Sequence, residues 1–241
     1  MLDRALSRTM DQLSHPAFRR VFFLGTVTAI IVLFITLFSL WTLWPAGTFT
    51  GWDWLDDWLM EWELLAKFAV YAPVAILGTY FLFPPLAVTA MGLLLDSIIE
   101  AVEAEYYPDR PAVRKVSVGE TVLMALKQGG VVLLVNLLAM PLYILFFFMS
   151  GGILSLGLYL LINGYLFGRE YFEMVAIRFM SKQDCRRLRA SQHSKAVLGG
   201  MVVAGLFLIP FANLIAPVFG AALMTHLVHY TLNRHSSGPE T

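Results

Sequence analysis

The feature that most constrains this chain is an apolar run from Val21 to Trp44 that contains no charged residue. As a helix, this run would be about 36 Å long at about 1.5 Å per residue, and the hydrocarbon core of a bilayer is about 30 Å thick. It is also much longer than the apolar region of a cleavable secretory signal, which has about 7–15 residues. We therefore expect a transmembrane helix that is retained in the protein.

The composition extends this expectation to the rest of the chain. Hydrophobic residues make up 58% and charged residues 14%, and the mean hydropathy is +0.70. A soluble domain is about half apolar and a quarter charged. Most of the surface is therefore expected to face lipid, which predicts an all-α integral membrane protein. The net charge of zero argues against a nucleic-acid partner.

The other apolar runs differ in length. Leu64–Phe83 is about one bilayer thick, with an expected kink at Pro73. Pro84-Pro85 is expected to interrupt the helix before a second helical stretch, Leu86–Glu105, leaves the membrane. This stretch carries a polar stripe that we expect to face water. The stripe consists of Asp96, Glu100 and Glu103.

Two shorter pairs of apolar segments predict helical hairpins. Val131–Met149 and Ile153–Phe167 flank Gly151-Gly152, and Ala196–Ile209 and Val218–Leu232 flank a break that runs from Pro210 to Pro217. Ile153–Phe167 would reach only about 22 Å, which is less than a full span. We therefore predict two long transmembrane helices and two hairpins that could penetrate the membrane only partly.

The distribution of charge predicts the orientation. Of the Lys and Arg residues, only Lys67 lies near the segment 45–63, which is acidic and lies in the region that holds all six tryptophans. The positive-inside rule places both termini in the cytoplasm. The membrane that we expect is a bacterial-type inner membrane. We expect one membrane domain, 1–241. Its parts are a cytoplasmic segment 1–20, an external loop 45–63 with an aromatic belt, a basic cytoplasmic connector 168–195 and a disordered tail 234–241.

The start of the first span is a candidate anion site. Ser14 is the expected N-cap, and free N–H groups at a helix start attract anions. Two arginines next to such a start match tetrahedral oxyanions. The simpler interpretation is that they only anchor the helix and set its topology. The candidate anion-binding residues are Pro16, Ala17, Phe18, Arg19 and Arg20.

A second group of polar residues could act as a gate or in coupling, because ionisable residues near a membrane segment are often functional. The group consists of Arg169, Glu170, Glu173 and Asn213. Alternatively, Arg169 and Glu173 form a structural ion pair at i,i+4 spacing. His226 and His229 could share a helix face, but no spacing suggests a third metal ligand. No nucleophile, nucleotide or cofactor motif is present, so we expect neither an enzyme nor a cofactor.

Cys185 is the only cysteine, which excludes an internal disulfide and a four-cysteine metal site. A small buried residue is the simpler interpretation. A reactive thiol activated by the neighbouring Arg186 and Arg187 is the alternative.

Three segments carry a family resemblance: Pro84 to Glu103, Asn163 to Glu173, and Ile209 to Ala222. Their order and spacing resemble the bacterial sulfate permease CysZ family and the wider etoposide-induced 2.4 domain family, over Ser14 to His229. The resemblance implies long transmembrane helices with partly penetrating hairpins, sulfate uptake for cysteine biosynthesis, and a homo-oligomer.

In that family an N-terminal Pro-Gly-Leu-Arg segment contacts sulfate, and it corresponds here to Pro16–Arg19. Ala17 replaces the glycine, and its Cβ narrows the approach of an anion to the backbone. Arg169–Glu173 also departs from the family pattern. The first hypothesis is a permease for a small inorganic anion, sulfate above others. The alternative is a membrane scaffold that uses the basic connector to bind lipid or a partner.

Overall fold

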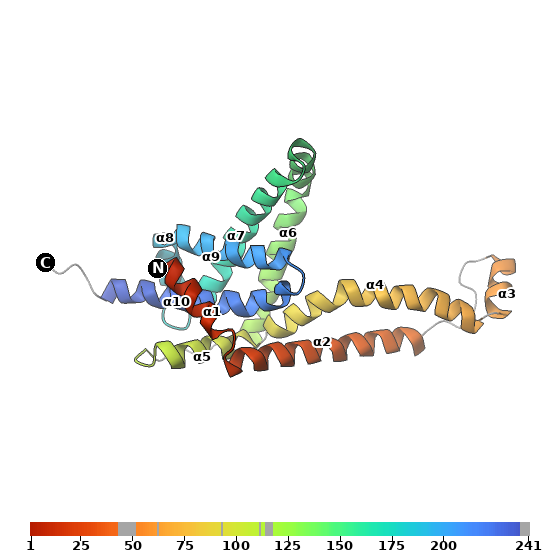
Figure 1. The fold of residues 1–241 in the computed structure, drawn as a ribbon, viewed down its shortest axis with the longest axis horizontal. Coiled ribbons are helices and arrows are strands. Elements are labelled where there is room, and N and C mark those ends of the chain that lie inside the picture. Colours follow the sequence, from red (N-terminus) through yellow and green to blue (C-terminus); the bar gives the residue numbers. More distant parts are fainter. Residues whose placement is uncertain (43–51, 62, 93, 111, 114–117, 237–241) are drawn as a thin grey trace. The chain divides into compact units, whose positions relative to one another are not determined.

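The protein is described from a computed structural model, and the described residues are 1–42, 52–61, 63–92, 94–110, 112–113 and 118–236. These residues form ten α-helices and no strand, which confirms the predicted all-α class (Figure 1). The helices are α1 (Leu2–Gln12), α2 (Pro16–Thr42), α3 (Asp53–Glu61), α4 (Glu63–Gly92), α5 (Leu95–Tyr106), α6 (Val118–Ser150), α7 (Ile153–Ala176), α8 (Lys182–Ser191), α9 (His193–Leu208) and α10 (Ala212–Ser236).

Three helices in the described part are long and apolar enough to cross a bilayer. Their apolar segments are Pro16–Ser39, Gly129–Ser150 and Ala212–Asn233. The protein is therefore an integral membrane protein. The chain divides into two compact units, residues 24–90 and residues 1–23 with 91–241, and each is described by itself.

In unit 24–90, α2 and α4 are joined by aromatic side chains. The Tyr71 hydroxyl donates to the Leu37 carbonyl at 2.8 Å. Trp41 packs on Phe68 and Tyr71, with ring centroids 5.3 and 4.9 Å apart. Trp41 thus contributes to helix packing, whereas Trp44 and Trp62 of the predicted aromatic belt lie outside the described residues.

Helix α4 is longer than the sequence suggested. It continues through Pro73 and Pro84-Pro85 and ends at Gly92. The predicted break at Pro84-Pro85 is therefore wrong. Each proline removes one backbone N–H donor, but long membrane helices tolerate this loss through local adjustment. The helix ends instead at glycine, which is a weak helix former.

The core of the other unit is formed by α7, α9 and α10. Two glycines of α7, Gly164 and Gly168, face Gly200 of α9. A Cβ at Gly200 would overlap the backbone of both α7 glycines, so the two helices can approach this closely only without side chains there. Small residues four apart are a common way to bring membrane helices together.

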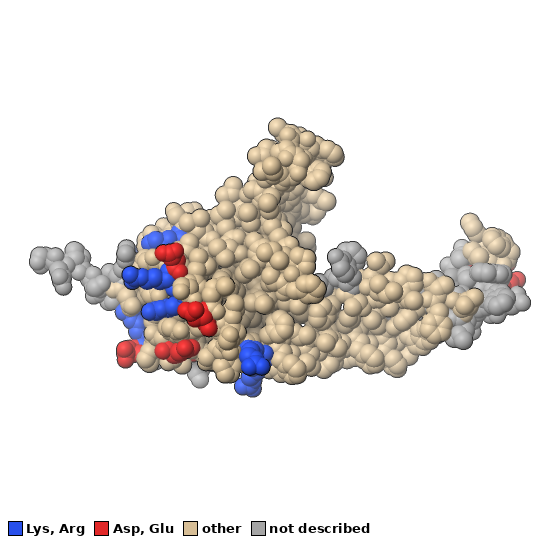
Figure 2. Space-filling view, in the orientation of Figure 1, with Lys and Arg blue, Asp and Glu red and all other residues tan. Residues whose placement is uncertain are grey.

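Helices α6 and α7 form the first predicted hairpin. Its turn consists of Gly151 and Gly152, both with positive φ, as expected for glycine. Helix α7 does not end at Phe167 but continues to Ala176, because the charged residues that follow the apolar run are good helix formers. In Figure 2 the visible face of this hairpin is free of charge, whereas charged side chains gather over α1 and α5 and at the start of α2.

Asn136 and Asn163 close the hairpin with reciprocal amide hydrogen bonds of 2.9 and 3.0 Å. The Tyr143 hydroxyl donates to the Asn136 Oδ1 at 2.9 Å. The second N–H of each amide reaches a carbonyl of its own helix. All four amide hydrogens are therefore used, and the pair fixes the register of α6 against α7.

The second hairpin, α9 and α10, turns within residues 209–211. Phe211 occupies this turn with φ of 66° and an exposed side chain. The predicted break up to Pro217 is wrong, since α10 runs through this proline. Although α10 has the composition of a membrane span, 78% of its apolar segment is buried inside the protein. Helix α10 is therefore a central helix, and α1 and α5 pack against it.

Candidate functional site

The candidate anion site begins where α1 meets α2. Helix α2 starts at Pro16, so His15 and not Ser14 is the N-cap. The His15 Nδ1 accepts the Ala17 N–H at 3.2 Å, and the His15 carbonyl accepts the N–H groups of Phe18 and Arg19. The predicted N-cap at Ser14 is wrong because a histidine ring nitrogen takes that role one residue later. The first amides of α2 are thus already bonded within the chain.

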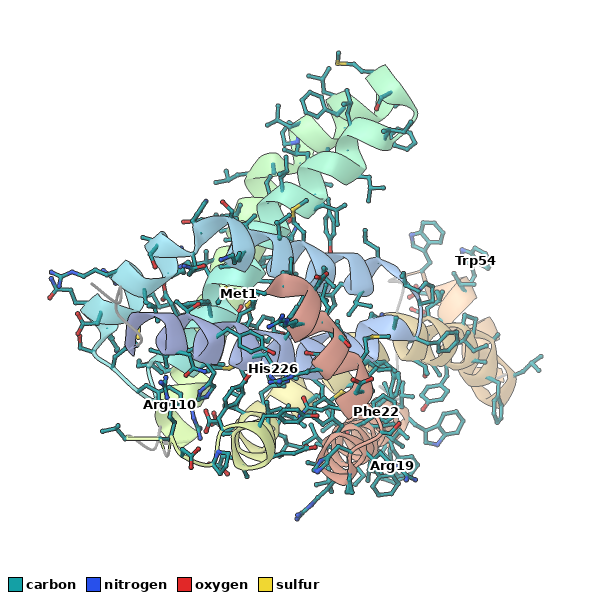
Figure 3. All side chains as sticks on the ribbon, turned by 60° about the vertical axis from the view of Figure 1, so that its left-hand side comes forward. Met1, Arg19, Phe22, Trp54, Arg110 and His226 are labelled. Carbon is teal, nitrogen blue, oxygen red and sulfur yellow. The ribbon has the colours of Figure 1, made fainter. Side chains whose placement is uncertain are left out.

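The arginines at this helix start lie on the surface. Arg19 and Arg20 are exposed, whereas Phe18 is 4% exposed and anchors the segment. Figure 3 shows the Arg19 side chain pointing away from the ribbon. Among the described residues neither guanidinium has an ion partner, whereas four other arginines pair with carboxylates. Those four are Arg169, Arg178, Arg187 and Arg189.

One carboxylate lies close to this segment. The Glu105 carboxylate is 3.9 Å from the His15 Nε2 and also accepts from the Gln12 amide at 3.4 Å. Its side chain is about half exposed. The helix start therefore combines two unpaired cations with one acidic neighbour that already has partners.

The predicted gate residues do not form one group. Glu173 is 3.7 Å from Arg169 and 3.0 Å from Arg189 of α8, so the i,i+4 pair of α7 is extended to a second helix. Asn213 lies after the far end of α9, beside the turn with Phe211, where its N–H donates to the Ile209 carbonyl. Because α9 has 16 residues, about 24 Å of helix separates the two places.

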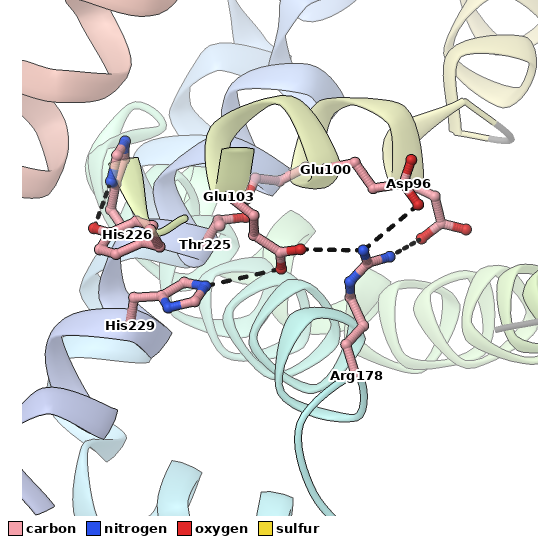
Figure 4. A network of polar contacts seen from close by, with 9 residues as sticks. Asp96, Glu100, Glu103, Arg178, Thr225, His226 and His229 are labelled. Atoms are coloured by element: carbon pink, nitrogen blue, oxygen red, sulfur yellow. Dashed lines mark hydrogen bonds and ion pairs between the residues drawn. The ribbon is translucent and has the colours of Figure 1, made fainter. Parts of the chain in front are cut away.

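A buried charge cluster lies where α5 meets the end of α7 (Figure 4). Arg178 is 4% exposed and lies between three carboxylates of α5. Its guanidinium contacts Glu103 at 3.1 Å, Glu100 at 3.6 Å and Asp96 at 3.7 Å. The acidic stripe was predicted to face water. This is wrong for Glu103, which is 8% exposed, because Arg178 supplies its counter-charge.

The two histidines of α10 adjoin this cluster, and their environments differ. Burial raises the pKa of Tyr107 above its usual range, so its hydroxyl stays protonated. The hydroxyl lies 2.8 Å from the His226 Nδ1, and the His226 Nε2 lies 3.0 Å from the Gln12 Oε1. His226 therefore has both of its ring nitrogens within hydrogen-bond distance of a partner. His229 is equally buried, but neither of its nitrogens has a hydrogen-bond partner.

No group of three or more His, Cys, Asp or Glu residues suited to a metal ion occurs in the described part of the chain. Cys185 is 2% exposed, and burial, with Glu173 and Asp184 nearby, raises the pKa of its thiol to about 11. The interpretation of Cys185 as a buried residue agrees with this environment. Activation by Arg186 and Arg187 does not.

Sequence reasoning found the acidic stripe but missed the residue that organises it. Arg178 was counted only as one of the basic residues of the connector. A basic residue that interrupts an otherwise apolar stretch was the available signal.

Comparison with known proteins gives one match to a protein family. The family model described as "Sulfate transporter CysZ/Etoposide-induced protein 2.4" matches residues 5–217. The match includes the start of α2, the charge cluster and most of the two hairpins. No curated protein matches the chain.

Proposed function

Since the chain belongs to the sulfate transporter CysZ and etoposide-induced protein 2.4 family, we propose that it is a permease for a small inorganic oxyanion, namely sulfate. The proposal places it in a bacterial inner membrane with both termini in the cytoplasm, as a homo-oligomer that supplies sulfate for cysteine biosynthesis. The family description names a transporter, and the helices provide the membrane-embedded body that such a protein needs.

The observation that carries the proposal is the pair of unpaired guanidinium groups at the start of α2. Arg19 and Arg20 present forked N–H donors that suit a tetrahedral dianion. Pro16 and the buried Phe18 hold the start of α2 in place, and the Cβ of Ala17 narrows the approach of an anion to the backbone. Because the amides of residues 17–19 are bonded to His15, the side chains of Arg19 and Arg20 supply the donors for the anion.

The alternative is a scaffold that uses the connector 168–195 as a basic surface. Much of the positive charge of that segment is neutralised within the chain. Arg169, Arg178, Arg187 and Arg189 pair with carboxylates. This pairing favours the permease over the scaffold.

The test is the flux of radiolabelled sulfate into proteoliposomes that contain the purified protein. We expect uptake above empty liposomes, competition by selenate, and a loss of about tenfold or more in the double variant Arg19→Ala/Arg20→Ala. Arg186→Ala, which removes another exposed arginine, is the matched control and should retain the flux. Uptake equal to that of empty liposomes would contradict the function. Full flux in the double variant would contradict only the site.

A further inference from the structure

The two buried atoms that face each other across α5 and α10 belong to Glu103 and His229. The Glu103 Oε1 and the His229 Nε2 are 3.8 Å apart, and neither makes a hydrogen bond. The other oxygen of Glu103 is occupied by Arg178 at 3.1 Å. Burial of unpaired polar atoms is unfavourable, so this arrangement calls for an explanation.

The histidine ring is held in place on both sides. Tyr107 stacks on it with centroids 3.9 Å apart and planes 6° apart, and Phe179 meets it edge-on at 5.0 Å. His229 is 0% exposed. Its Nε2 is therefore aimed at Glu103 by packing and does not depend on a hydrogen bond for its direction.

The charge around this ring is unbalanced. The charged and titratable groups of the surrounding elements are Asp96, Glu100 and Glu103 on α5, Tyr107 directly after α5, and Arg178 after α7. His226 and Tyr230 lie on α10, and Arg8 lies on α1 above Tyr230. Tyr107 and His226 are hydrogen-bonded to each other. Three carboxylates thus face the single guanidinium of Arg178, and Arg8 stacks on the rings of Tyr106 and Tyr230 instead. A second positive charge inside the cluster would reduce this excess.

We propose that His229 and Glu103 form a buried proton-binding site that fastens α10 to α5 when His229 carries a proton. A hydronium ion transfers its proton to the free nitrogen of the neutral imidazole and leaves as water, so one O–H bond is broken and one N–H bond is formed. The Nε2–H of the imidazolium then donates to the Glu103 Oε1, which replaces two unpaired atoms by one charge-assisted hydrogen bond.

Proton access follows from the exposure of the cluster. The side chains of Glu100 and Asp96 are 60% and 34% exposed, so the cluster extends from His229 to the surface. The site links three parts of the unit, since Glu103 also binds Arg178 next to the end of α7. The inference goes beyond the proposed permease function and holds whichever ion the protein carries.

The direct test is the titration of His229 by NMR of the full-length protein in nanodiscs with labelled histidine. The resonance assigned through His229→Phe should change on acidification to that of an imidazole with two N–H groups, whereas that of His226 should not, because both of its nitrogens are already bonded. A His229 resonance that stays unchanged on acidification of the folded protein would overturn the proposal.

Hydrogen exchange in the same preparation tests whether protonation of His229 stabilises the packing of α10 on α5. Amides of α5 in the wild type should be better protected at low than at high pH, by about threefold or more after correction for intrinsic rates. Glu103→Gln and His229→Phe should abolish this pH dependence, and His193→Gln, at the exposed start of α9, should retain it. If His229→Phe retains the full pH dependence, the site is not responsible for it.

Discussion

At the scale of single residues, Arg178 shows how a buried charge is tolerated. Its guanidinium is almost fully buried, yet three carboxylates of α5 surround it, one of them nearly as buried. Removal of Arg178 would destabilise the fold mainly because it would leave an uncompensated buried charge on Glu103.

We therefore expect Arg178→Met to lower the free energy of unfolding by about 3–5 kcal/mol. Thermal and denaturant unfolding in detergent would measure the change. Glu100→Gln is the matched control, because its carboxylate is 60% exposed and should cost less than about 1 kcal/mol. Equal losses in the two variants would argue against a special role of burial.

Cys185 leads to a prediction about reactivity. Burial raises the pKa of its thiol from 9.0 to about 11, which lowers the thiolate fraction at pH 8 about a hundredfold. Maleimide should therefore label the folded protein very slowly and the unfolded protein fast. Arg186→Cys on the exposed face of α8 provides the reference rate. If Cys185 and the cysteine of the Arg186→Cys variant are labelled at comparable rates in the folded protein, Cys185 is not buried.

At the scale of elements, close packing of α7 on α9 depends on glycine. Gly200→Ala would place a Cβ against the backbone of Gly164 and Gly168, and backbone cannot move aside as a flexible side chain can. We expect a loss of about 1–3 kcal/mol from overpacking, measured by thermal unfolding.

The control for this substitution is Gly157→Ala on the open side of α7. No atom lies within 4 Å of a Cβ at this position. The better helix propensity of alanine should stabilise the helix slightly, by up to about 1 kcal/mol. If both alanines have the same effect, the glycines do not set the distance between the helices.

The α6–α7 hairpin depends on its paired amides. Asn136→Leu or Asn163→Leu alone leaves the partner amide without its hydrogen bonds and should cost about 1–2 kcal/mol. The double variant should cost less than the sum of the two, because no amide is then left unpaired. Unfolding measurements on all four proteins give the coupling energy, and strict additivity would show that the amides act independently.

At the scale of the whole molecule, the two hairpins should differ in depth. Helix α6 has 33 residues and α9 has 16, about 50 and 24 Å, and the hydrocarbon core is about 30 Å thick. Helix α6 of the first hairpin is long enough to cross, whereas α9 of the second hairpin is not.

Cysteine labelling in intact cells can test this difference in a Cys185→Ala background. Ile153 and Phe211, at the tips of the two hairpins, are both exposed on the protein. An impermeant maleimide should label Ile153→Cys from outside, because the tip of the first hairpin would reach water. It should label Phe211→Cys from neither side, because the tip of the second hairpin would remain in the membrane. The proposed orientation places residue 186 in the cytoplasm, so Arg186→Cys should be labelled only after lysis and serves as the control. External labelling of Phe211→Cys would show that the second hairpin also crosses.

Much of this protein could be predicted from its sequence alone. Apolar length determines which segments form membrane helices, and Gly151-Gly152 marks a turn because few other residues adopt positive φ. Sequence motifs also indicated the family. Helix ends were less predictable, since Pro84-Pro85 and Pro217 lie inside helices whose other backbone groups remain paired.

The tertiary structure decided which polar residues meet. Helical periodicity placed the acidic residues of α5 on one face, but whether that face is wet depends on Arg178, which comes from a distant part of the chain. The same holds for His226 and His229, which are alike in local sequence. One is bonded by Tyr107 and Gln12 and the other faces Glu103, because partners remote in sequence are brought together only by packing.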